Sequence, residues 1–93
     1  MGRMDGKVAL ISGGAEGLGA AIATLIVAEG GSVMLGDVQA AKAQATAAGL
    51  GDRAAAVELD VRDLAQWERA VAATLERFGK LNVLTSCSCY WRD

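Results

Sequence analysis

The sequence predicts an α/β domain in which a doubly wound parallel sheet carries helices on both faces. Two observations lead to this prediction. Four short apolar runs of strand length alternate with three longer stretches of helical character. A cluster of glycines separates the first strand from the first helix, as it does in sheets that bind dinucleotides. Strands joined through helices form right-handed parallel units, and we expect the strand order three, two, one, four.

The composition and net charge of the chain limit the classes of molecule that it is expected to bind. The 93 residues make one small domain, 53% of them are hydrophobic, and the formal net charge is −2. A chain without a basic field is not expected to bind nucleic acid or an anionic membrane surface. No apolar run reaches the ~20 residues of a membrane helix, and the start of the chain lacks a secretory apolar segment. We therefore expect a cytoplasmic protein.

The first strand, turn and helix lie within residues 8–28. An apolar run from Val8 to Ile11 predicts a buried strand, and the helix after it has apolar residues at i, i+4, i+7 and i+8: Leu18, Ile22, Leu25 and Ile26. Between them stand Gly13, Gly17 and Gly19. Glycines here permit positive φ and close approach of a ligand to the backbone. Helical N–H groups from about Gly17 onward have no partner within the helix, and a pyrophosphate would satisfy them.

The remaining elements follow in the same alternation. We expect strands at 32–35, 55–59 and 81–85 and helices at about 39–48 and 64–78. Gly49 is the predicted stop of the helix at 39–48, whereas Asp63 and Gly79 are the predicted caps of the last helix. That helix has an apolar stripe at spacings of three and four, in which Trp67 and Phe78 are predicted core residues; its members are Leu64, Trp67, Val71, Leu75 and Phe78.

Acidic residues follow the second and third strands. Asp37, with Val38 beside it, comes roughly 20 residues after the glycine cluster, where an acid accepts both hydroxyls of an adenosine ribose. Asp60 and Val61 end the third strand, where adenine would rest in the expected strand order. The alternatives are structural: a tight turn for the glycines, a solvated loop residue for Asp37, and a helix cap for Asp60.

These residues carry a family resemblance. The segment Ile11 to Gly19 resembles the T-G-x-x-x-G-x-G cofactor motif of the short-chain dehydrogenase/reductase family, with Ser12 in place of threonine. The likeness extends through 59–61 and 78–84. The amino-acid sequence of these segments is similar to that of bacterial NAD-dependent hydroxysteroid and secondary-alcohol dehydrogenases. It implies a Rossmann-type fold truncated after the fourth strand. Residues 1–85 would be the partial NAD(P)-binding domain and 86–93 a divergent tail.

The resemblance ends before the family's catalytic residues. The family continues from the fourth strand into an N-N-A-G loop, but this chain has Ser-Cys-Ser-Cys at 86–89. The only tyrosine, Tyr90, would need its lysine partner beyond the last residue, so no catalytic residue is assigned. Cys87 and Cys89, with no histidine in the chain, are expected to be incidental thiols and not metal ligands.

We therefore predict the NAD-binding portion of a short-chain oxidoreductase that is not catalytic by itself. Backbone contacts to pyrophosphate would come from Gly13, Gly17, Leu18 and Gly19. Asp37 would exclude the 2′-phosphate of NADP, and Glu16 in the turn adds a second negative charge. The fourth strand would be a bare sheet edge, at which copies of the chain could pair. Two alternatives stay open: a non-catalytic nucleotide-binding or interaction module, and a methyltransferase-type sheet.

Overall fold

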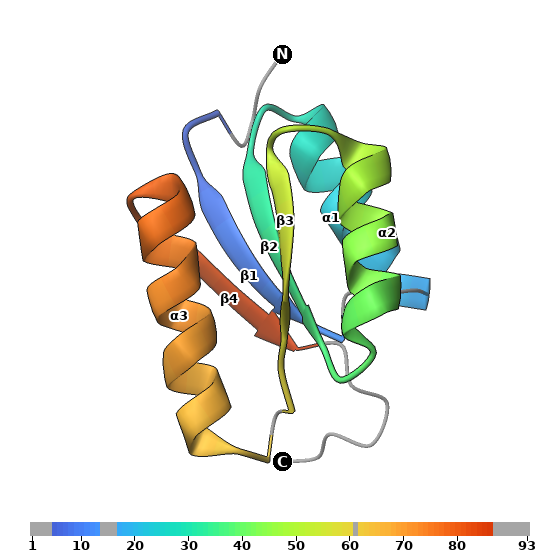
Figure 1. Ribbon diagram of the computed structural model, residues 1–93. Coiled ribbons are helices and arrows are strands. Elements are labelled where there is room, and N and C mark those ends of the chain that lie inside the picture. Colours follow the sequence, from blue (N-terminus) through green and yellow to red (C-terminus); the bar gives the residue numbers. More distant parts are fainter. Residues whose placement is uncertain (1–4, 14–16, 61, 87–93) are drawn as a thin grey trace.

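The protein is a four-stranded parallel sheet with helices on both faces, as the sequence predicts (Figure 1). The computed structural model describes residues 5–13, 17–60, 62–82 and the backbone of 83–86. Its strands and helices alternate in the order β1 (Val8–Ser12), α1 (Gly17–Ala28), β2 (Ser32–Asp37), α2 (Ala40–Leu50), β3 (Ala54–Glu58), α3 (Leu64–Phe78) and β4 (Val83–Ser86). The strand order is β3-β2-β1-β4, which confirms the expected topology.

The helices divide between the two faces of the sheet. Figure 1 shows α1 and α2 together on one side of the strands and α3 on the other. This division follows from the direction of the crossovers. The chain moves from β1 to β2 to β3 in one direction and then returns past β1 to β4, so right-handed connections place α3 on the opposite face.

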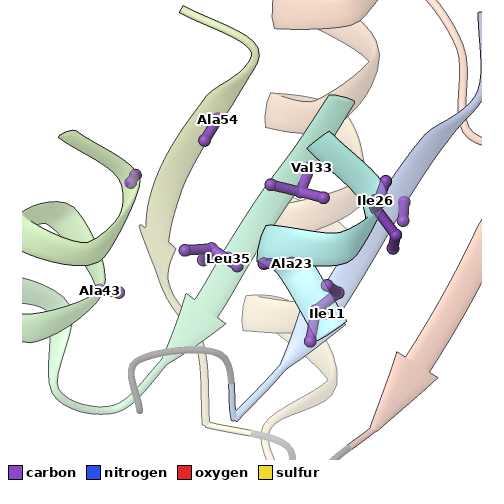
Figure 2. Close-up of a cluster of buried hydrophobic side chains, with 9 residues drawn as sticks. Ile11, Ala23, Ile26, Val33, Leu35, Ala43 and Ala54 are labelled. Atoms are coloured by element: carbon purple, nitrogen blue, oxygen red, sulfur yellow. The ribbon is translucent and has the colours of Figure 1, made fainter. Parts of the chain in front are cut away.

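The face covered by α1 and α2 holds a cluster of small and medium aliphatic side chains (Figure 2). Ile11, Val33 and Leu35 point from β1 and β2 toward this face, and each is fully buried. The helices contribute mainly alanines, among them Ala23 of α1 and Ala43 of α2, which are also fully buried. Side chains of this size let both helices approach the sheet closely.

The face covered by α3 holds larger side chains. Leu10, Met34 and Leu59 form its buried centre with Ala70 of α3. Trp67 and Phe78, predicted as core residues, pack against this cluster but are only partly buried. The predicted apolar stripe of this helix was wrong at two positions, because Leu64 and Leu75 are 72% and 46% exposed. The helix turns its buried residues Ala70 and Thr74 toward the sheet, so one side of the predicted stripe faces solvent.

Two other predictions need correction. In α1, Leu18 and Leu25 were expected on the buried stripe but are 68% and 64% exposed, and the buried residues are Gly19, Ala23 and Ile26. The helix turns its smaller side chains inward because it lies close to the sheet. Helix α2 continues through Gly49 and ends at Leu50. Gly51, with φ +98°, is its true C-cap, since a left-handed backbone ends a helix more decisively than a glycine with ordinary φ.

The caps of α3 are as predicted. The Asp63 carboxylate accepts hydrogen bonds from the backbone N–H groups of Ala65 and Gln66, and Gly79 ends the helix with φ +84°. Strand β4 is then tied to β1 by Asn82. Its side-chain oxygen accepts from Val8 N at 2.9 Å, and its own N–H donates to Val8 O at 2.9 Å. Within the described ranges, no helix is long and apolar enough to cross a membrane.

Candidate functional site

The turn after β1 begins with a strained backbone that only glycine adopts readily. Gly13 has φ +74°, and its N–H donates to the carbonyl of Gly36 in β2 at 2.7 Å. Gly17 opens α1 with φ +67°, and a β-carbon added there would meet no atom within 4 Å. Among the described residues, the space beside the Gly17 Cα is therefore free. Gly19, two residues further along, is buried, whereas Leu18 projects outward.

At the base of this turn lies a buried hydroxyl group. Ser12 is the last residue of β1 and is fully buried, and its Oγ has no hydrogen-bond partner among the described atoms. A buried hydroxyl without a partner costs free energy, so such groups mark places where a structure accommodates a further polar atom. Ser12 is the position at which the sequence departs from the threonine of the cofactor motif.

Asp37 stands where the sequence places it, at the carboxyl end of β2. Its Oδ1 accepts a hydrogen bond from Gln39 N at 2.9 Å, which closes the turn into α2 and orients the carboxylate. The residue is half-buried, so the carboxylate reaches solvent at the sheet edge. Val38, directly after it, is 56% exposed. Asp37 is therefore more than a solvated loop residue, because a defined turn holds its side chain.

Asp60 follows β3 and does not cap α3, the role that Asp63 takes. Its Oδ1 accepts from Arg62 N at 3.0 Å and from Arg62 Nε at 3.2 Å, and its Oδ2 accepts from Arg62 Nη2 at 3.3 Å. Its own N–H donates to Gln66 Oε1 at 2.7 Å. The hydrogen bonds from the Arg62 side chain and backbone lower the pKa of Asp60 below its ordinary 3.8, against a smaller effect of burial.

The parallel register brings these residues to one edge of the sheet. Ser12 pairs with Gly36, and Asp37 pairs with Glu58, so Gly13, Asp37 and Asp60 all lie beyond the carboxyl ends of adjacent strands. In an open α/β sheet, ligands bind outside these ends. Two predicted site residues, Glu16 and Val61, fall outside the described residues.

The arrangement brings together groups that are suited to binding. It offers backbone N–H groups at a helix start beside two carboxylates that can accept hydrogen bonds from hydroxyl or amino groups. Such a set fits a dinucleotide: glycines that leave room for pyrophosphate, an oriented acid for a ribose, and a second acid one strand further for a base. In the part of the chain that the structure describes, no group of three or more acidic, histidine or cysteine residues could hold a metal ion.

Sequence reasoning missed Arg62 and Gln66. Gln66 lies three residues after the N-cap Asp63, the position that in a capping box reaches back to the N–H of the cap itself. That spacing was a usable signal, although in the structure the side chain reaches the N–H of Asp60 instead. The contact of Arg62 depends on the conformation of a turn, which no periodic pattern encodes.

The chain is similar to proteins of known family. Residues 7–90 match the short chain dehydrogenase family, six residues beyond the resemblance in motifs, which ends at residue 84. The chain is 48% identical over 85 residues to the 3-alpha-(or 20-beta)-hydroxysteroid dehydrogenase of Mycobacterium tuberculosis, an alignment that covers 91% of this chain and 33% of that protein. It is 45% identical over 84 residues to the sorbitol dehydrogenase of Cereibacter sphaeroides, with 90% and 33% covered.

The fold of the chain is also similar to that of a solved structure. The 3-ketoacyl-(acyl-carrier-protein) reductase of Brucella melitensis, crystallised with NADH, superposes with a TM-score of 0.85 at 38% identity. The match covers 87% of this chain and 34% of the reductase. The chain thus spans about a third of the length of the proteins that it resembles.

Proposed function

The chain belongs to the short chain dehydrogenase family, and from this premise we propose that it binds the adenosine and pyrophosphate parts of NAD. One observation carries the proposal: the oriented carboxylate of Asp37 lies at the end of β2, on the strand that pairs with β1 where the chain enters its glycine cluster. The family match decides against the methyltransferase-type alternative.

Each predicted site residue has a role in this proposal. The backbone of the glycine turn and the start of α1 binds pyrophosphate, through Gly13, Gly17, Leu18 and Gly19. Asp37, flanked by Val38, accepts from the ribose hydroxyls, and Glu16 adds negative charge in the turn. Asp60 and Val61 contact adenine. In full-length members of the family, the nicotinamide of the bound cofactor exchanges hydride with an alcohol or ketone. We propose the same reaction only for a longer enzyme of which this chain would be the NAD-binding part.

Selectivity for NAD over NADP tests the role of Asp37. A carboxylate ~4 Å from a 2′-phosphate is repelled by about 1–3 kcal/mol after screening, which corresponds to roughly ten- to a hundredfold in affinity. Calorimetry should show that NAD binds more tightly than NADP by this factor, and Asp37→Ala should reduce the difference in affinity. Asp52→Ala is the matched control, since this exposed acid precedes β3 and so lies at the opposite edge of the sheet. Equal binding of NADP by the unaltered protein would refute the role of Asp37.

We propose that the 93-residue polypeptide binds NAD without turning over an alcohol. The family's serine and Tyr-x-x-x-Lys pair have no counterparts at matching positions of this sequence, and groups that act as a unit lose their effect together. The division into a binding part at 1–85 and a tail at 86–93 belongs to the same proposal. NADH production from secondary alcohols by the purified chain, surviving Tyr90→Phe, would contradict it.

We further propose that copies of the chain pair through β4. In the described sheet β4 has a neighbour on one side only, so its other side presents unpaired N–H and C=O groups. Lysine at an edge discourages such pairing. Val83→Lys or Thr85→Lys should therefore shift sedimentation toward the monomer. A monomer at every concentration without these changes would exclude pairing.

The location that we propose is the cytoplasm. Its support is the spacing of Cys87 and Cys89, which are too close in sequence for an unstrained disulfide with each other, so free thiols are expected. Free thiols persist in a reducing compartment. Fractionation of cells that express the tagged chain tests this location, and recovery from an oxidising compartment would refute it.

A further inference from the structure

On the α3 face, the described helices are one too few for the width of the sheet. Neighbouring strands lie about 4.8 Å apart and packed helices about 8–10 Å apart, so one helix covers roughly two strands. In the described part of the chain, α1 and α2 share one face of the four strands, whereas α3 lies alone on the other (Figure 1). The main contacts of α3 with the sheet are to β1, β2 and β3. Room for one more helix therefore remains on this face, over β4.

An apolar groove runs along one side of α3. It has a volume of about 350 Å³, and the described residues that line it belong to α3 itself, with Trp67, Val71 and Leu75 on successive turns. Leu75 is 46% exposed. Leu64, two turns before Val71 and on the same side of the helix, is 72% exposed and extends the apolar surface.

Contacts on the other side of α3 show which way the groove faces. The Oε1 atom of Gln66 accepts from the N–H of Asp60, directly beyond β3, and Arg77 Nη2 donates to the carbonyl of Asp52, before β3, at 2.9 Å. This side of α3 therefore faces β3. Successive residues turn by about 100° around a helix, which places Val71 on the opposite side from Gln66 and Arg77. The groove thus faces away from β3, toward the space over β4.

The topology of the sheet indicates what fills this space. The step from β3 to β4 crosses the sheet in one direction, with α3 on this face. A further step in the same direction, to a strand beyond β4, places its helix on the same face if the crossover is right-handed. That helix would lie over β4, beside α3. The chain spans about a third of the length of its relatives, which therefore continue well beyond the matched segment.

We propose that the groove of α3 is the docking site of an amphipathic helix, the one that leads on from β4 in the remaining part of a short chain dehydrogenase. A separate polypeptide that carries this helix is the partner that the groove fits. The apolar side of the helix covers Trp67 and Leu75 in the manner of other helix-in-groove complexes. The inference rests on the proposed function, because that function assigns the chain to the binding part of a longer enzyme.

The test follows the fluorescence emission of Trp67. The chain has one other tryptophan, Trp91, so the full chain with Trp91→Phe keeps Trp67 as its only reporter. The probe is a synthetic peptide of about 30 residues, long enough for a loop and a helix of ordinary length. Its sequence is the one that follows the aligned segment in the hydroxysteroid dehydrogenase of Mycobacterium tuberculosis. As peptide is added, the emission should shift to shorter wavelength and saturate, because the docked helix removes water from the indole.

Substitutions of exposed leucines locate the peptide. Leu75→Glu should weaken peptide binding at least about tenfold, because it puts a charge into the apolar groove. Leu75→Gln, which is uncharged, is the second variant if Leu75→Glu does not fold, and it should weaken binding by about threefold or more. Leu25→Glu is the matched control: this leucine is 64% exposed on α1, on the opposite face of the sheet, and its substitution should leave the affinity unchanged.

An emission that does not shift, or peptide binding that the substitutions of Leu75 leave unchanged, overturns the inference. A dimer of the chain that Leu75→Glu dissociates in sedimentation overturns it too, since a second copy would then occupy the groove. Titration of the same samples with NAD separates the two proposals. NAD binding without peptide binding overturns only the inference, whereas peptide binding without NAD binding overturns the proposed function and supports the docking site.

Discussion

The two faces of the sheet are covered in different ways. On the face of α1 and α2, two helices rich in alanine lie over Ile11, Val33 and Leu35, and all three side chains are fully buried. On the opposite face a single helix, α3, covers larger residues and leaves Leu64 and Leu75 in solvent. Small side chains on the two helices give a closed core, although Leu18 and Leu25 on the outer side of α1 are 68% and 64% exposed. On the other face the single helix leaves an open flank.

The open flank of α3 is a shallow apolar groove. Its lining comes from successive turns of the helix: Trp67, Glu68, Val71, Ala72 and Leu75. Apolar surface left in water contributes little to the free energy of folding. The closed face should therefore supply most of the stability, although its side chains are smaller. Substitutions on the two faces test whether they contribute unequally to the free energy of unfolding.

Removing the same atoms from each face should have unequal effects. Leu35→Ala empties a fully buried position and should lower the free energy of unfolding by about 2–5 kcal/mol. Leu75→Ala removes an identical side chain that is 46% exposed and should lower it by less than ~1 kcal/mol. Urea denaturation followed by circular dichroism measures both. Similar losses would mean that the two faces contribute alike.

Much of the fold was predictable because it depends on local pattern. Alternating strands and helices determine the parallel topology, and the caps at Asp63 and Gly79 follow from chemistry within one helical turn. The buried side of α1 was not predictable from hydropathy, which favoured Leu18 and Leu25. How closely the helix approaches the sheet decides whether alanine or leucine faces inward, and that distance is a property of the assembled layers.

Part of the candidate site could likewise be predicted from the sequence, and part could not. Gly13, Asp37 and Asp60 could be placed from sequence because the carboxyl ends of parallel strands share one edge. The partners of Asp60 could not be placed, since Arg62 and Gln66 reach it only through the shape of one turn. Predictions from pattern thus located residues at the carboxyl ends of the strands but missed the side chains that bond to Asp60.

Glycine-to-alanine substitutions distinguish positions where an added β-carbon would clash from positions where there is space for it. A β-carbon on Gly36 would lie 2.6 Å from Leu59 Cδ2 and 3.0 Å from Leu59 Cβ, on the α3 face. Because Leu59 is buried, Gly36→Ala should lower the free energy of unfolding by about 1–3 kcal/mol.

The control lies in α2 of the closed face. An added β-carbon on Gly49 meets no atom within 4 Å, so Gly49→Ala should be neutral or stabilise by up to ~1 kcal/mol. In a Leu59→Ala background the cost of Gly36→Ala should shrink, because the nearest clashing atom, Leu59 Cδ2, is gone and only the Cβ at 3.0 Å remains. An unchanged cost in that background would show that the clash with Leu59 is not the cause.

The smallest effect concerns the turn that anchors α3, the helix of the open face. Hydrogen bonds from Arg62 lower the pKa of Asp60 in the folded protein below its ordinary 3.8. A depressed pKa means that the folded state binds this proton less readily than the unfolded state. The stabilisation is therefore fully present above the unfolded pKa of about 4 and is lost as the pH falls through the folded value. Arg62→Ala should make stability fall less steeply as the pH drops below about 4, whereas Arg69→Ala, an exposed cation on α3, should leave this slope nearly unchanged. Urea midpoints measured across that range would show the difference, and parallel slopes for the unaltered protein and Arg62→Ala would mean that the Asp60–Arg62 pair does not contribute to stability in solution.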